Sequence, residues 1–196
     1  DMGASLSVAH GLELADVTGR TKRPVVGVIG DSTFAHSGIT SLLGTVYNAG
    51  VGTLCILDNR TTAMTGCQGN PCNGITLHEQ VRGANPLAVE KGKRLDIEAL
   101  CRALGVDDVR SVDAQDYEAV KAALKQATGT DTLTVLVFHS PCRLIDRSRN
   151  AVAVVNECRA CGKCVRIGCP AIGKDAEGHA VIDPTQCIGC SQCVQV

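Results

Sequence analysis

Tryptophan is absent from the chain, and tyrosine and phenylalanine occur only twice each. Proteins that bind single-stranded nucleic acid stack bases on aromatic side chains, so this composition offers little for such binding. Lys and Arg total 19 against 20 Asp and Glu, and no block of like charge forms the basic footprint typical of nucleic-acid binding. No stretch approaches the ~20 apolar residues of a membrane span. We therefore expect neither nucleic acid nor a membrane as a partner.

Apolar residues and cysteine, by contrast, are plentiful. The 196 residues are 44% apolar, which is enough for one full domain and a small second one. The chain has 12 cysteines, many of them in Cys-x-x-Cys runs, and no signal peptide is recognisable. This pattern favours metal binding in a reducing cytoplasm over disulfides in a secreted protein. The chain opens at Asp1 and stops inside a motif, so we expect a piece of a longer polypeptide.

Strand and helix patterns alternate along the first three quarters of the chain. Short β-branched runs predict strands at 24–30, 53–57, 109–112 and 133–138, and helical spacing of apolar residues predicts helices at 39–46, 96–104 and 116–127. A polar loop should separate the first strand from the first helix, and an aperiodic loop should run to about Gly74. The alternation predicts an α/β domain, with a parallel sheet covered by helices on both faces.

A domain boundary is predicted near Ser148, giving domains 1–148 and 149–196. The composition turns basic at Arg143, Arg147 and Arg149, and becomes apolar before the first clustered cysteine. We interpret the basic stretch as a solvated connector, with docking of an acidic partner as the alternative.

The last forty residues contain an internal cysteine repeat. Its first copy is Cys158, Cys161, Cys164 and Cys169, followed by Pro170, and three of these recur 29 residues later as Cys187, Cys190 and Cys193. Cubane iron-sulfur clusters need four thiolates, and in two-cluster ferredoxins the fourth cysteine of a run ligates the other cluster. The repeat therefore predicts a ferredoxin-like domain with two [4Fe-4S] clusters.

The predicted clusters are unequally supplied with ligands. Cys169 completes the set of Cys187, Cys190 and Cys193, whereas the first triplet should take a fourth cysteine just past Val196. The four-residue spacer before Cys169 is one longer than the usual three. Structural zinc and disulfides are the alternative readings.

A second motif lies at the ends of two predicted strands. Gly30, Asp31 and Ser32 follow the first strand, and Asp58 and Asn59 follow the next after 25 further residues. Parallel sheets bind ligands at this edge, and carboxylate and amide oxygens suit magnesium, while helix N-termini suit phosphate. The pattern fits a magnesium-diphosphate clamp, with a structural turn as the alternative.

The segments GDSTFAHSGI and LDNRTTAMTG resemble the thiamine-diphosphate-binding domain of 2-oxoacid:ferredoxin oxidoreductases, most closely the indolepyruvate type. The resemblance also covers the opening MGASLSVAHGLELA and the appended cysteine region. It implies that Asp31 and Asn59 bind magnesium by their side chains and Thr61 by its backbone oxygen. The residues implied to line the cofactor are Gly30, Ser32, Thr33, Thr62, Met64, Thr65 and Gly66. His36 would approach the reacting centre, unless it caps or packs a helix.

The resemblance further implies the reaction and its partners. An arylpyruvate such as indolepyruvate would be oxidatively decarboxylated, coenzyme A would take the acyl group, and electrons would leave through the clusters to an external ferredoxin. A second, small subunit and a separate pyrimidine-binding domain are implied, so the segment alone should be inactive. The alternatives are a different 2-oxoacid or a non-catalytic electron-transfer module.

The remaining five cysteines are predicted to bind no cluster. Cys67 and Cys72 lie where the family tends to have histidine and proline; we interpret them as free loop thiols, with metal binding as the alternative. Cys55, Cys101 and Cys142 are expected to be buried.

Overall fold

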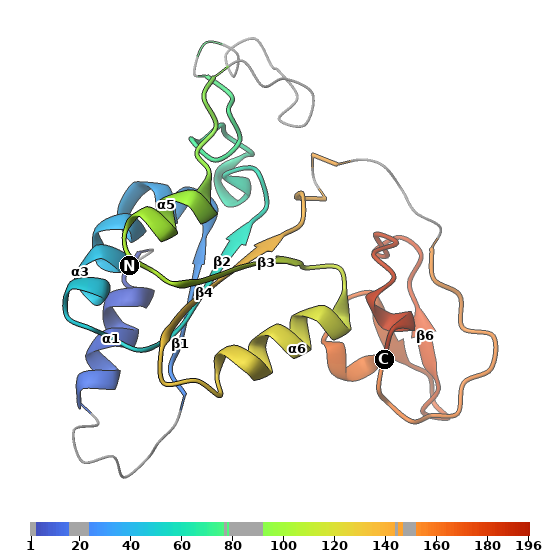
Figure 1. Ribbon diagram of the computed structural model, residues 1–196. Coiled ribbons are helices and arrows are strands. Elements are labelled where there is room, and N and C mark those ends of the chain that lie inside the picture. Colours follow the sequence, from blue (N-terminus) through green and yellow to red (C-terminus); the bar gives the residue numbers. More distant parts are fainter. Residues whose placement is uncertain (1–2, 16–23, 77, 79–91, 144, 147–151) are drawn as a thin grey trace. The chain divides into compact units, whose positions relative to one another are not determined.

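The computed structural model describes residues 3–15, 24–76, 78, 92–143, 145–146 and 152–196 (Figure 1). The chain divides into two compact units. The first comprises Asp1–Ala114 with Ala119–Asp146, and the second comprises Gln115–Glu118 with Arg147–Val196. The boundary predicted at Ser148 lies outside the described residues.

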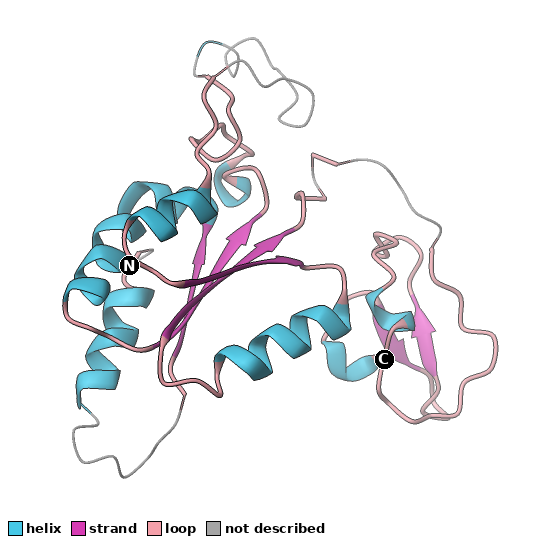
Figure 2. Cartoon of the chain, viewed as in Figure 1, coloured by secondary structure: helices cyan, strands magenta, loops and turns pink. Residues whose placement is uncertain are grey.

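The first unit is built on a four-stranded sheet. Its strands are β1 (Val26–Gly30), β2 (Gly52–Asp58), β3 (Asp108–Asp113) and β4 (Leu133–His139), in the order β1-β2-β4-β3 (Figure 2). All neighbouring pairs are parallel, as predicted. In this register Gly30 lies opposite Leu57, and Asp58 lies opposite His139. The residues that follow β1, β2 and β4 therefore gather at one edge of the sheet.

Helices cover both faces of this sheet, as the alternating pattern predicted. The helices α1 (Ser5–Ala15), α3 (Ile39–Tyr47) and α5 (Ile97–Ala103) lie on one side, and α6 (Tyr117–Ala127) lies on the other (Figure 1). Side chains alternate along each strand, so Leu54 and Ile56 pack in the larger core with Leu42 of α3. Cys55 faces the opposite way and packs with Ala127 of α6.

The connection from β1 into the first covering helix differs from the prediction. The polar residues after β1 form helix directly: α2 (Asp31–Thr33) runs into a π-helical turn, η1 (Phe34–Gly38), and then into α3. Burial of Phe34 anchors this turn. A Cβ on Gly38 would lie 2.7 Å from Phe34 Cδ2 and 2.9 Å from Ile29 Cδ1, so the turn requires glycine there. Single π turns occur often at functional sites.

The second unit is small. It contains a two-stranded antiparallel sheet of β5 (Ile172–Lys174) and β6 (Ala180–Ile182), with the short 3-10 turns η3 (Val165–Ile167) and η4 (Gln192–Val194). A further 3-10 turn, η2 (Ala63–Thr65), lies in the first unit. The assignment of the second unit as a ferredoxin-like domain stays a prediction. None of the helices in the described ranges has the length and apolar character needed to cross a membrane.

The core of the first unit offers a direct test of the packing. Leu42 is fully buried, whereas its neighbour Leu43 is 50% exposed. Leu42→Ala should lower the free energy of unfolding by about 2–5 kcal/mol, because it removes buried methyl groups and leaves a cavity. Leu43→Ala is the matched control and should change it by only about 0.5 kcal/mol. Urea unfolding measures both; equal effects would contradict the packing described.

Candidate functional site

Asp31 lies at the carboxyl edge of the sheet, directly after β1. It is only 2% exposed, and its Oδ2 accepts a hydrogen bond from Asn70 Nδ2 at 3.3 Å. The pKa of this carboxyl is raised from 3.8 to about 6, because burial and the nearby charge of Asp58 outweigh the hydrogen bonds that lower it. A buried carboxylate beside a second one favours a bound cation.

The loop after β2 folds back over the start of the helical segment. Thr62 Oγ1 donates to Ser32 Oγ at 2.9 Å, and the Cys72 thiol donates to the Asp31 backbone oxygen at 3.6 Å. Asn70 also stabilises a turn within this loop, because its Oδ1 accepts a hydrogen bond from the backbone N–H of Cys72 at 2.8 Å. The loop therefore places the Asn70 amide against the Asp31 carboxylate and the Thr62 hydroxyl against Ser32.

Asp58 is buried as well, but its oxygens are already engaged. Its Oδ2 lies 2.9 Å from His139 Nδ1 and 3.4 Å from an Arg94 guanidinium nitrogen, and its Oδ1 accepts the backbone N–H of Arg60. His139 Nε2 lies 2.7 Å from Glu98 Oε1. Arg94 also donates from Nε to the Cys72 backbone oxygen at 2.9 Å. Asp58 thus binds together β2, β4, α5 and the loop.

The structure brings together some of the predicted site residues and leaves others apart. Asp31, Ser32 and Thr62 form one hydrogen-bonded group through Asn70. Asn59 Oδ1 accepts the backbone N–H of Thr61, which is itself buried.

The outlying predicted residues have other surroundings. Met64 is 87% exposed, and His36 is exposed in the π turn. Thr65 Oγ1 donates to Gln68 Oε1 at 2.6 Å, and Gly66 has a left-handed φ of 120°. Gly30 and Thr33 are half-buried beside Asp31. The roles of these residues stay predictions.

Sequence reasoning missed three residues of this site and interpreted a fourth, Cys72, as a free loop thiol. Asn70, Arg94 and His139 contact Asp31 or Asp58, and buried Cys72 contacts Asp31. Asn70 lies 39 positions from its partner and His139 lies 81 positions from Asp58. Of the three missed residues, only Asn70 had a signal, because it lies in the aperiodic loop that the sequence predicts to run to about Gly74.

The site's donor set fits a magnesium ion and a diphosphate. Carboxylate, amide, hydroxyl and backbone oxygens are hard ligands of the kind that magnesium prefers. The buried carboxyl of Asp31 is the residue on which a cation would act most strongly, since a positive charge offsets its desolvation. The backbone N–H groups at the start of the helical run from Asp31 to Tyr47 suit phosphate oxygens.

The two cysteine loops share a backbone conformation. Ala160 and Gly189, which precede the second cysteine of each triplet, have φ of 50° and 67°. Gly162 and Ser191, which follow it, have φ of 71° and 61°. Left-handed residues of this kind turn successive backbone N–H groups inward, as at many iron-sulfur sites. The 29-residue repeat is therefore a repeat of structure as well as of sequence.

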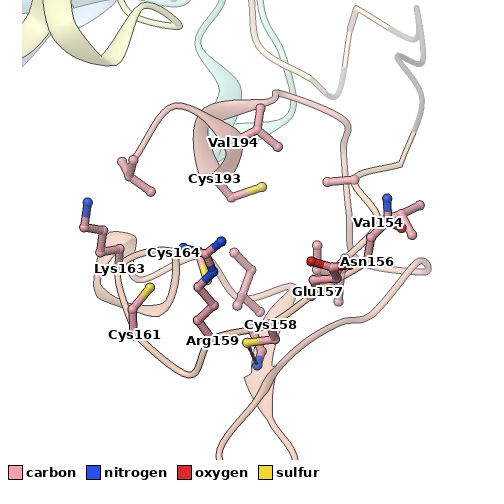
Figure 3. A pocket seen from close by; sticks show the side chains of 16 residues that line it. Val154, Asn156, Glu157, Cys158, Arg159, Cys161, Lys163, Cys164, Cys193 and Val194 are labelled. Carbon is pink, nitrogen blue, oxygen red and sulfur yellow. Dashed lines mark hydrogen bonds between the residues drawn. The ribbon is translucent and has the colours of Figure 1, made fainter.

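The cysteines of the repeat gather around one part of the second unit. Cys158, Cys161, Cys164 and Cys193 line a largely apolar cavity of about 320 Å³ (Figure 3). Burial raises the pKa of Cys193, and Cys190, Cys187 and Cys169 are close enough to raise it further. These three are the partners predicted for Cys193. In the described ranges, no three His, Cys, Asp or Glu side chains are arranged to hold a single metal ion.

All 12 cysteines are free thiols. Cys55 and Cys101 are buried as expected, and burial raises the pKa of these thiols to about 11 and about 12. The expectation that Cys142 is buried was wrong: it is half-buried, because it follows β4 at the site edge, where its N–H donates to the Asn59 oxygen. Cys67 is half-buried, and Cys72 is fully buried with its pKa raised to about 12.

Comparison with known proteins shows that most of the chain matches one protein family. Residues 1–138 match the family described as thiamine pyrophosphate enzyme, C-terminal TPP binding domain. Two curated relatives match along the whole chain: indolepyruvate oxidoreductase subunit IorA of Thermococcus kodakarensis, at 36% identity, and that of Pyrococcus horikoshii, at 38%. In each, the match covers 100% of this chain and 32% of the relative. The chain thus spans about a third of the length of these relatives.

One solved structure shows the same fold at low identity. A 2-oxoglutarate:ferredoxin oxidoreductase from Magnetococcus marinus superposes with a TM-score of 0.58 at 15% identity. The superposition covers 74% of this chain and 47% of that chain.

The raised pKa of Asp31 predicts how stability changes with pH. Without metal, the folded carboxyl keeps its proton up to about pH 6, whereas the unfolded one releases it near 3.8. The free energy of unfolding should therefore fall as the pH rises from about 4 to about 6. Asp31→Asn should remove this loss, making the variant more stable above pH 6 by on the order of 2 kcal/mol, with no difference below about pH 4.

Urea unfolding in EDTA across this pH range measures the effect. Asp107→Asn, which removes an exposed carboxylate, is the matched control and should follow the wild type. An Asp31→Asn variant that is less stable than wild type at pH 7 would contradict the burial described.

Proposed function

Because the chain belongs to the thiamine pyrophosphate enzyme family, through the C-terminal TPP binding domain, we propose that it binds thiamine diphosphate and magnesium at the carboxyl edge of its sheet. The observation that carries this proposal is the buried carboxyl of Asp31, which accepts from the Asn70 amide and lies next to the hydrogen-bonded hydroxyls of Ser32 and Thr62. A protein without a ligand here would gain stability by losing that carboxyl.

The binding roles are assigned to residues of this edge. Asp31 and Asn59 bind magnesium by their side chains, and Thr61 binds it by its backbone oxygen. The diphosphate lies against the backbone at Gly30 and the hydroxyls of Ser32 and Thr33. The cofactor is enclosed further by the loop residues Thr62, Met64, Thr65 and Gly66. His36 lies at the reacting centre.

We propose that the full polypeptide oxidatively decarboxylates an arylpyruvate of the indolepyruvate type. Both relatives are named as indolepyruvate oxidoreductase subunits, which supports this substrate class. Thiamine diphosphate supplies, when bound, a store for the electron pair that decarboxylation releases. Coenzyme A accepts the acyl group, and a second subunit completes the assembly in the cytoplasm.

The cysteine repeat supplies the electron outlet in this proposal. One [4Fe-4S] cluster is held by Cys169, Cys187, Cys190 and Cys193, and Cys158, Cys161 and Cys164 hold a second. Cys193 lies near its three predicted partners, and the three cysteines of the other set line one apolar cavity, which Cys193 lines as well. When bound, a cubane cluster would carry one electron at a time, so the two electrons of one decarboxylation would pass singly to an external ferredoxin.

The proposal predicts substrate-dependent reduction of the clusters. In the full-length protein with its partner subunit, indolepyruvate with thiamine diphosphate, magnesium and coenzyme A should bleach the iron-sulfur absorbance under anaerobic conditions. Asp31→Asn should slow the bleaching at least about 100-fold, because it removes the buried charge that holds the cation. Reduction by dithionite should be unaffected, since the clusters stay in place.

Asp107→Asn is the control for the loss of one carboxylate and should bleach like wild type. Bleaching by pyruvate or 2-oxoglutarate in place of indolepyruvate would reassign the substrate. Clusters that dithionite reduces, in a protein that binds no thiamine diphosphate in the presence of magnesium, would overturn the enzyme proposal and favour a non-catalytic electron carrier.

A further inference from the structure

The two cysteine triplets differ in the charge of the residues between their cysteines. Arg159 and Lys163 lie within the first loop. The intervening residues of the second loop are all uncharged: Ile188, Gly189, Ser191 and Gln192. Because the two loops share a backbone conformation, the charge of these residues distinguishes two sites of otherwise similar geometry.

These cations lie where a cluster on the first triplet would experience them. Arg159 and Lys163 line the cavity that all three cysteines of the first triplet line, together with Cys193 of the second (Figure 3). Glu157 is the one acidic side chain among the residues that line it, so the lining side chains carry a net positive charge. Both cations are exposed, and salt should screen part of their effect.

Backbone N–H donors to sulfur add to the effect of these charges in the first set. The backbone N–H groups of Ala160 and Ala180 donate to Cys158 Sγ at 3.4 and 3.2 Å. In the second set, a backbone hydrogen bond of Cys193 lowers the pKa of its own thiol, against the burial that raises it. The Ala180 donor comes from β6, which is paired with β5, so its position is fixed by the sheet.

The cations between the first cysteines and the N–H donors to Cys158 both act on the reduction potential of a cluster. Reduction adds one negative charge, and nearby cations and N–H donors to the thiolate sulfurs stabilise the reduced form. One positive charge ~6 Å away in a water-like dielectric favours reduction about threefold. We propose that the cluster held by Cys158, Cys161 and Cys164 has the higher potential, so that electrons from the thiamine reaction come to rest there.

This inference rests on the proposed function, because it presupposes two clusters. The step it describes transfers one electron from the cluster on Cys169, Cys187, Cys190 and Cys193, which is oxidised, to the cluster on the first triplet, which is reduced. No bond forms or breaks. The external acceptor would then take electrons from the cluster of the first triplet.

The test is a redox titration of the full-length protein followed by electron paramagnetic resonance at low salt. Two midpoint potentials are expected in the wild type. The double variant Arg159→Gln/Lys163→Gln should lower the higher midpoint by about 59 mV, which is a tenfold change for one electron. The lower midpoint should move less, and added salt should shrink the wild-type difference.

Lys174→Gln removes the same charge from β5 of the same unit, outside the cysteine loops, and should leave both midpoints nearly unchanged. Ala180→Pro removes the β6 donor and should lower the higher midpoint, whereas Ala180→Gly keeps the N–H and should not. The charge variants leave the backbone intact, so they decide the matter if Ala180→Pro fails to fold.

The outcomes separate this inference from the function on which it rests. Wild-type protein that contains no iron would overturn the two-cluster proposal and the inference together. Two clusters with one shared midpoint would overturn the inference alone. A double variant that moves the lower midpoint as much as the higher one, or moves neither, would also overturn it.

Discussion

The parallel pairing of β1 with β2 is the constraint on which the site depends, because it places two buried carboxyls, Asp31 and Asp58, at one edge of the sheet. Two such groups without partners would be strongly unfavourable. Asp58 is offset by Arg94 and His139. Among the residues that the structure describes, Asp31 has only the Asn70 amide as a side-chain donor, and its pKa is raised to about 6. Asp58 therefore has its partners within the protein, whereas a bound cation would stabilise the ionised carboxylate of Asp31.

The same contacts hold the loop in place before any ligand binds. Arg94 joins the Cys72 backbone oxygen to Asp58, and Thr62 joins the loop to Ser32. A loop held by such bonds loses less conformational entropy when it closes over a cofactor. In the second unit the repeated left-handed residues serve the cysteine loops in the same way, since they fix the direction of the N–H groups around the thiols.

Much of the fold was predictable because its signals are local. The β-branched runs and the helical spacing at Ile39–Val46 depend on neighbouring residues, and the four strands lie where they were predicted. Helix α1 was not predicted from periodicity, and it leaves Val8 and Leu12 exposed. The loop expected after Gly30 is helical, because burial of Phe34 overrides the turn preference of Asp31 and Ser32. Arg94 and His139 were missed because their partner Asp58 is distant in sequence and nothing local marks a long-range ion pair. The family resemblance was confirmed by its relatives, whereas the individual ligand roles stay predictions.

Hydrogen-deuterium exchange with and without the cofactor tests most directly the claim that this edge holds thiamine diphosphate and magnesium. The full-length protein would be compared alone, with magnesium only, and with magnesium plus thiamine diphosphate. Slower exchange in the peptides covering Gly30–Phe34 and Asn59–Gly74, and unchanged exchange in α6, is the predicted result. Unchanged exchange in both of those peptides, with the cofactor bound elsewhere, would contradict it.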